Sequence, residues 1–200
     1  MAHDAGRPRH LRHFLLFSIV LGASALPAYA QPAASTNSAP LHATASADHS
    51  PGQGWGFRLG FQDHYRNATL VYQTPTWWSY RSQSGWGRLE LNAELGVSYW
   101  TATQGDPDSL WQLSATPMLR WWPNEYFYTE IGVGATVLSR TRFADRHFGT
   151  AFQFGDHVGL GFLINRSHEI GLRFSHFSNA GIKLPNDGLD LYQLTYTYRY

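Results

Sequence analysis

The sequence predicts an eight-stranded antiparallel transmembrane β-barrel behind a cleaved targeting segment. Three observations predict this fold class. Only 14% of the 200 residues are charged and 16% are aromatic, whereas soluble domains carry about 25% charged residues. Most of the chain alternates large apolar with small or polar residues, as a strand with two unlike faces does. No apolar run is long enough for a membrane-spanning helix.

The N-terminal segment, residues 1–30, has the three parts of a secretory signal peptide. Arginines within 7–12 give a positive start, an apolar run covers 14–26, and Ala-Tyr-Ala at 28–30 is a small-x-small cleavage site. The apolar run is too short to cross about 30 Å of hydrocarbon, which argues against a membrane anchor. Residues 31–53 are rich in Ala, Ser, Pro and His, so we expect a flexible leader there.

The barrel is expected in residues 54–200, where period-two alternation is clearest at 55–61 and 88–99. Connections alternate short and long, a pattern typical of outer-membrane barrels: those at 122–125 and 165–167 are tight, and those at 102–109, 139–151 and 179–188 are longer. The eight predicted strands are 55–66, 68–75, 86–101, 110–121, 126–138, 152–164, 168–178 and 189–200.

Side-chain volume decides which face of these strands points outward. Roughly thirty large apolar side chains share one face, and the interior of an eight-stranded barrel is just filled by its own side chains, so they do not fit inside. The apolar face therefore meets lipid. The other face carries glycines and charges that can pair inside the barrel: Arg58, Arg88, Glu90, Glu94, Arg120 and Glu130.

Aromatic residues gather at the strand ends and resemble the two interfacial belts of membrane proteins. The chain also ends on an aromatic strand closing at Tyr200, which resembles the assembly signal of bacterial outer-membrane proteins. One belt comprises Trp55, Trp77, Trp78, Trp86, Trp121 and Trp122, and the other Tyr99, Trp100 and Trp111.

Composition excludes several other classes of function. The chain has no cysteine, so it holds no disulfide, thiolate metal site or cysteine nucleophile. A net charge of +1 gives no basic excess for nucleic acid. His64, His157 and His168 lack a shared spacing for a metal site, so we expect neither a metal nor a cofactor.

Three polar residues stand on the face that otherwise meets lipid. By strand parity His176 and Ser178 share the face of Phe174, and Asp190 shares the outward face of the next strand. Polar groups facing hydrocarbon cost free energy unless they are satisfied. One interpretation is a Ser-His-Asp relay, in which the imidazole takes the serine proton and the carboxylate orients the imidazole. The other is a set of ordinary polar residues in the headgroup layer.

The local sequence resembles a known signature. The segment His176-Phe-Ser-Asn-Ala-Gly, followed by Pro-Asn-Asp-Gly at 185–188 and by Asp190, resembles the C-terminal motif of the PagL family of lipid A 3-O-deacylases. The resemblance implies that His176 is the base and Ser178 the nucleophile, and that Asn179 helps to form the oxyanion hole. The third member of the family's triad is usually a glutamate, and Asp190, one methylene shorter, stands at its position.

This resemblance implies an outer-membrane serine esterase of a Gram-negative bacterium. Its substrate would be lipopolysaccharide, from which it would remove the 3-O-linked 3-hydroxyacyl chain of lipid A, with the active site facing the outer leaflet. Two alternatives remain: a non-catalytic barrel for adhesion or membrane integrity, and a soluble lipocalin-like binder. A homodimer also stays open. Candidates for contact with the lipid A phosphates are Arg140, Arg142 and Arg146, unless their loop is simply solvated.

Overall fold

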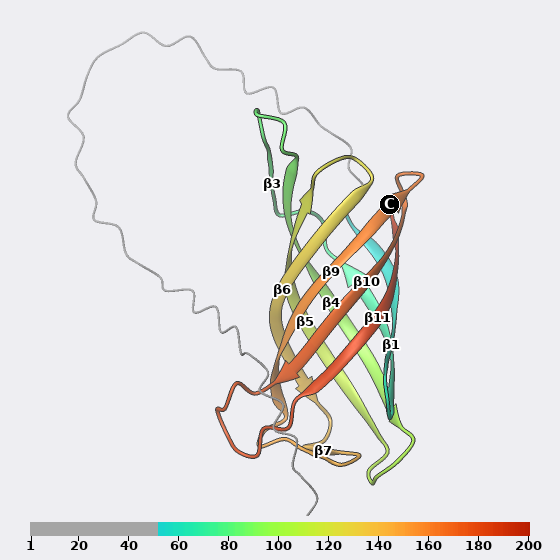
Figure 1. Ribbon diagram of the computed structural model, residues 1–200, viewed down its shortest axis with the longest axis vertical. Helices are drawn as coiled ribbons and strands as arrows, with labels where there is room; N and C mark the ends of the chain where they lie inside the picture. The colour runs from blue at the N-terminus through green and yellow to red at the C-terminus, as the bar shows by residue number, and fades with distance from the viewer. Residues whose placement is uncertain (1–51) are drawn as a thin grey trace, which may run out of the picture. The chain divides into compact units, whose positions relative to one another are not determined.

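The computed structural model describes residues 52–200, which form a barrel of β-strands (Figure 1). In this part of the chain no helix is long and apolar enough to cross a membrane. The predicted signal peptide and nearly all of the leader lie outside the described residues and stay predictions. The strands are β1 (Gly54–Gln62), β2 (Tyr65–Gln73), β3 (Trp78–Arg81), β4 (Arg88–Ala102), β5 (Ser109–Trp122), β6 (Phe127–Leu138), β7 (Arg142–Phe143), β8 (Arg146–His147), β9 (Phe152–Ile164), β10 (His168–Ser178) and β11 (Leu189–Arg199).

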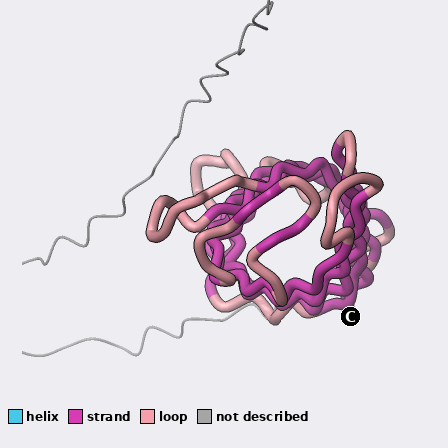
Figure 2. The backbone as a smooth tube through the Cα atoms, turned by 90° about the horizontal axis from the view of Figure 1, so that it is seen from below, coloured by secondary structure: helices cyan, strands magenta, loops and turns pink. Residues whose placement is uncertain are grey.

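Antiparallel pairing closes the wall into a ring. The strands follow the order β1, β2, β4, β5, β6, β9, β10 and β11, and β11 pairs back with β1. Figure 2, seen from the end at which β7 lies, shows this ring. The predicted eight-stranded antiparallel barrel is confirmed. Gly54 lies opposite Arg199, and we call their end of the barrel the terminal end and the opposite end, with residues 139–151 and 179–188, the loop end.

The strand boundaries differ from the prediction mainly in the first hairpin. Its turn lies at Asp63 and His64, and Asn67, expected near the turn, belongs to β2. The Asn67 side chain is buried in the interior, where Thr69 Oγ1 donates to its Oδ1 at 2.9 Å. A polar residue fits inside this strand because the interior of the barrel is polar.

The predicted alternation of short and long connections is wrong between β2 and β4. That connection covers 74–87 at the terminal end and contains β3, which pairs with the first residues of β4. The N–H groups of Thr74 and Trp77 donate to the Ala93 and Leu91 carbonyls of β4. β2 and β3 are therefore one interrupted strand, which hydrophobic patterning alone does not reveal.

The outward face is apolar, as predicted. Along β1 and residues 131–137 of β6, burial alternates residue by residue, and the large apolar side chains are the exposed ones. Phe57 on β1, Val133 on β6 and Leu172 on β10 are each 58–61% exposed. An exposed apolar band around a closed barrel is the surface that a lipid bilayer covers.

Two of the tryptophans expected in the belts lie inside the barrel instead. Trp122 is 1% exposed and donates its indole N–H to Glu90 at 2.8 Å, while Trp100 is fully buried and donates to Gln112. Neighbouring residues of a strand point to opposite faces, so only Trp121 of the pair Trp121–Trp122 can face outward. The belt prediction is wrong for these two residues because it ignored this parity.

The interior holds a network of paired charges. Glu94 accepts hydrogen bonds from Arg58 at 2.7 Å and from Arg173 at 2.7 and 2.9 Å. Glu130 pairs with Arg173 at 2.6 Å and with Arg120 at 3.0 Å. The same network continues through Glu169 and Arg199. The interior placement predicted for the charges is confirmed, and the pairing fixes the wall from inside.

Candidate active site

The residues His176 and Asp190 lie directly opposite each other on β10 and β11. His176 Nδ1 and Asp190 Oδ1 are 2.7 Å apart, and the side chains are 32% and 45% exposed. The register places both on the outward face near the loop end, since Phe174 and Tyr192 form the next outward pair. The aspartate therefore reaches the imidazole despite its shorter side chain.

The candidate nucleophile Ser178 is the last residue of β10, two positions after His176 on the same face. It is only 8% exposed. Within residues 52–200 no hydrogen bond joins the Ser178 hydroxyl to His176. Residues i and i+2 on a strand are about 7 Å apart at Cα, a gap that a side-chain rotation can bridge.

The buried Asn179 organises the loop that follows the serine. Its backbone N–H donates to Asn186 Oδ1 at 2.9 Å, and its Nδ2 donates to the Lys183 carbonyl at 2.7 Å. Its Oδ1 accepts the N–H of Gly181 at 2.9 Å. Ala180, with φ of 52°, turns the chain between them. In the described chain the Ala180 N–H is not engaged in a hydrogen bond, so it is a second candidate oxyanion donor.

Two residues beside His176 were not singled out from the sequence. Asp156 on β9 lies opposite His176 on its other side and is exposed. Its parity with Val158 would have revealed it, because a carboxylate on that face is as unusual as the histidine. Gly188 is the other: a Cβ there would lie 2.7 Å from His176 Cε1. The sequence alone does not reveal this steric limit at Gly188, because it comes from a contact with His176 on the neighbouring strand.

The three candidate phosphate ligands lie in the loop between β6 and β9, at the loop end. Arg140 and Arg142 are exposed, while Arg146 Nε donates to the Tyr65 hydroxyl at 3.0 Å. Partial burial disfavours the charged form of Arg146, but Tyr65 and nearby carboxylates outweigh burial and raise the pKa of Arg146. A hydrogen bond from the backbone N–H of His147 to the Asp187 carboxylate joins this loop to the loop after Ser178.

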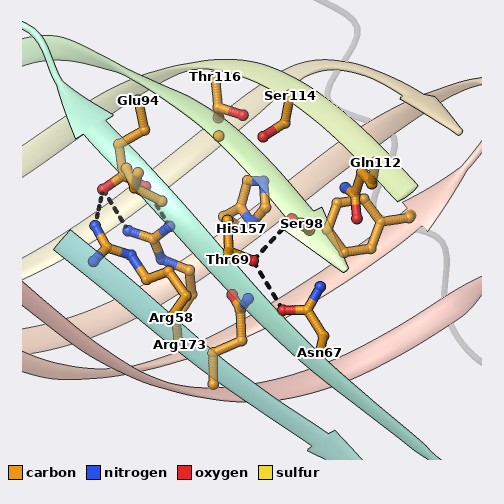
Figure 3. A pocket seen from close by; sticks show the side chains of 14 residues that line it. Arg58, Asn67, Thr69, Glu94, Ser98, Gln112, Ser114, Thr116, His157 and Arg173 are labelled. Carbon is orange, nitrogen blue, oxygen red and sulfur yellow. Dashed lines mark hydrogen bonds and ion pairs between the residues drawn. The ribbon is translucent and has the colours of Figure 1, made fainter. Parts of the chain in front are cut away.

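A second histidine–serine pair lies inside the barrel. His157 Nδ1 and Ser175 Oγ are 2.8 Å apart, and His157 lines a polar cavity of about 30 Å³ (Figure 3). That volume holds about two waters, which is too small for an acyl chain. The outward pair is therefore the one that a lipid can reach. In the part of the chain described, no group of three or more His, Asp or Glu residues is arranged to hold a metal ion.

A filled barrel with an apolar exterior defines a small membrane β-barrel, and this one carries a histidine–carboxylate pair on that exterior. The family model described as "Lipid A 3-O-deacylase (PagL)" matches residues 51–199. The chain belongs to this family, whose members are ester hydrolases of the outer membrane.

Individual relatives agree with the family assignment. The chain is 58% identical over 160 residues to lipid A deacylase PagL of Bordetella bronchiseptica, covering 79% of this chain and 90% of the relative. It is 33% identical over 128 residues to lipid A deacylase PagL of Pseudomonas aeruginosa, covering 60% and 69%. The crystal structure of the outer membrane enzyme PagL matches with a TM-score of 0.63 and 27% identity, over 74% of this chain and 99% of that one.

Proposed function

We propose that this protein hydrolyses the ester joining the 3-hydroxyacyl chain to the 3-position of lipid A, with Ser178 as nucleophile. The family assignment supports the substrate and the bond cleaved. The observation that carries the choice of residues is the His176–Asp190 contact of 2.7 Å on the lipid-facing surface, two residues from Ser178.

The chemistry follows the logic of a serine hydrolase. Asp190 accepts a hydrogen bond from Nδ1–H of His176, which leaves Nε2 as the free base. Nε2 takes the proton of Ser178 as its Oγ attacks the ester carbonyl. The tetrahedral intermediate collapses, the sugar oxygen leaves with the proton from His176, and an acyl-serine remains. Water, activated by the same imidazole, then releases the 3-hydroxy fatty acid and restores Ser178.

The negative oxygen of the intermediate needs hydrogen-bond donors, which are usually the largest single contribution to catalysis. In this proposal Asn179 and the turn after it supply them. The Ala180 N–H is the donor that the loop leaves unused, and Asn179 fixes the turn through Lys183 and Gly181.

The position of the site suits a substrate that stays in the membrane. The proposal places the loop end outside the cell, so that His176 and Ser178 face the outer leaflet, where lipopolysaccharide lies. Lipid A then reaches the serine by lateral diffusion. Arg140, Arg142 and Arg146 would contact its phosphates, since guanidinium groups bind phosphate bidentately. One chain suffices, because the proposed triad comes from the β10–β11 hairpin alone.

The test is mass spectrometry of lipid A from cells that express the protein. The wild type is expected to remove a 3-hydroxyacyl chain, and Ser178→Ala to remove none. Ser175→Ala, which changes the interior serine beside His157, is the matched control and should stay active. Lipid A left intact by the wild type would support the non-catalytic barrel, and activity lost in Ser175→Ala but kept in Ser178→Ala would reverse the assignment.

A further inference from the structure

Most of the loop that follows Ser178 is exposed. Residues 179–188 connect β10 to β11, and their apolar side chains Ile182 and Leu184 are 65% and 79% exposed. The loop must nevertheless hold Ser178 and the turn after it in a fixed place. A misplacement of about 1 Å in an active site costs about 10²-fold in rate.

The neighbouring loop, 139–151, is hydrogen-bonded to this one. The N–H of His147 donates to Asp187 Oδ2 at 2.8 Å, and the N–H of Asp187 donates to the His147 carbonyl at 3.2 Å. These reciprocal bonds tie Asp187 to the end of β8. Figure 1 shows both loops at the end of the barrel where β7 lies.

Two further contacts extend the connection along the chain. Phe148 and Asn186 form a β-bridge, and the N–H of Gly149 donates to the Pro185 carbonyl at 2.5 Å. The approach at Gly149 is so close that a Cβ there would lie 2.1 Å from the Lys183 carbonyl oxygen. Since Asn186 Oδ1 accepts the N–H of Asn179, the connection continues to the residue after Ser178.

The loop 139–151 is itself anchored in the barrel. Phe143 is fully buried and Phe148 is 4% exposed, and both belong to the apolar cluster at the loop end of the interior. Phe143 packs edge-on against Trp100 with ring centres 6.1 Å apart. The anchored loop can therefore fix the position of the exposed one.

We propose that residues 147–149 and 185–187 form a latch that positions Ser178, and that Asp187 is its positioning residue. The inference rests on the proposed function, since it concerns how the nucleophile of that reaction is held. Asp187 touches neither lipid A nor His176 in this scheme. It acts through the hydrogen bond from His147 and through its neighbour Asn186, which holds Asn179.

The expected effects separate positioning from binding. Asp187→Ala removes the acceptor for the His147 N–H, and kcat for lipid A in mixed micelles should fall about 10- to 100-fold with KM within about twofold. Asp187→Asn keeps an acceptor oxygen at that place, so it should restore kcat to within about threefold of the wild type. Asp63→Ala, an exposed change in the β1–β2 turn at the same end, is the matched control and should change neither constant.

A second variant changes the other loop of the latch, 139–151. Gly149→Ala forces the loops apart at the Lys183 carbonyl, and it should lower kcat as Asp187→Ala does. Each variant is first shown to be a folded barrel by its heat-dependent mobility in gels. An inactive wild type refutes the proposed function itself. With an active wild type, a kcat unchanged in Asp187→Ala, or equally low in Asp187→Asn, refutes the latch.

Discussion

The shorter carboxylate of this chain reaches its histidine because the two residues are paired in register. Asp190 lies directly across from His176, so the missing methylene is compensated by the placement of the strands. Asp190→Asn keeps the shape but loses the charge that stabilises the imidazolium. We expect its deacylation rate to fall about 10²-fold, the lower limit for loss of general acid–base catalysis.

The opposite substitution, Asp190→Glu, tests whether only an aspartate at this position can contact His176. Asp190→Glu places a longer side chain where Asp190 Oδ1 already lies 2.7 Å from the imidazole. A glutamate can fold back by rotation, so we expect partial activity, measured as release of 3-hydroxy fatty acid. Complete loss would show that an aspartate and a glutamate are not equivalent at this position.

The site depends on one glycine that the motif contains for a steric reason. Gly188 passes beneath the imidazole, and a Cβ would lie 2.7 Å from His176 Cε1. Gly188→Ala should displace the ring from Asp190 and lower kcat about 10²-fold while the barrel still folds. A wild-type rate in this variant would mean that the loop moves aside at little cost.

Parity along single strands was enough to predict part of this site. It placed His176 and Asp190 on the outward face before any contact was known, and applied to β9 it would also have found Asp156. The hydrogen bonds of Asn179 and the close approach of Gly188 depend on how a loop folds over the strand end. Period-two patterning contains no information about how this loop folds.

At the scale of the strands, alternation predicts six of the eight barrel strands to within about two residues at each end and misplaces the turn between the first two. The predicted turn at Asn67 is wrong because Asn67 is a strand residue whose side chain points into a polar interior. The extension of β2 by β3 was missed for a related reason. β3 is exposed along its whole length, so it shows no alternation in burial, and only its pairing with β4 reveals it.

The strands β5 and β6 approach each other closely at Gly134, which gives a prediction for these two strands. A Cβ at Gly134 would lie 2.4 Å from Thr116 Oγ1 and 2.5 Å from the Ala115 carbonyl oxygen. Gly134→Val should therefore destabilise the barrel by about 1–3 kcal/mol through overpacking. Urea unfolding in detergent measures this, with the outward-facing Val133→Ala as control. Equal stabilities of the two variants would contradict the close approach.

For the whole molecule, the contrast between an apolar outward face and a polar interior explains both the low charge of the sequence and the stability of the barrel wall. The apolar side chains point to lipid, and the charges that remain pair inside, where water is scarce. Such pairs gain little over apolar packing, but removing one member leaves a charge buried without a partner. The barrel therefore depends on the network being complete rather than on any one pair.

Glu94 is the residue at which this dependence is greatest. It lies 2.7 Å from both Arg58 and Arg173 and 3.4 Å from Arg120. Glu94→Gln removes the charge that these guanidinium groups share and should lower the free energy of unfolding by about 3–5 kcal/mol. Glu125→Gln breaks an exposed pair with Arg81 (63% and 53% exposed) and should cost about 0–1 kcal/mol. If urea unfolding gives the two variants the same stability, the interior charges fill space without fixing the barrel. If only Glu94→Gln is destabilised, the paired interior holds the rigid wall on which His176 and Asp190 stay in register.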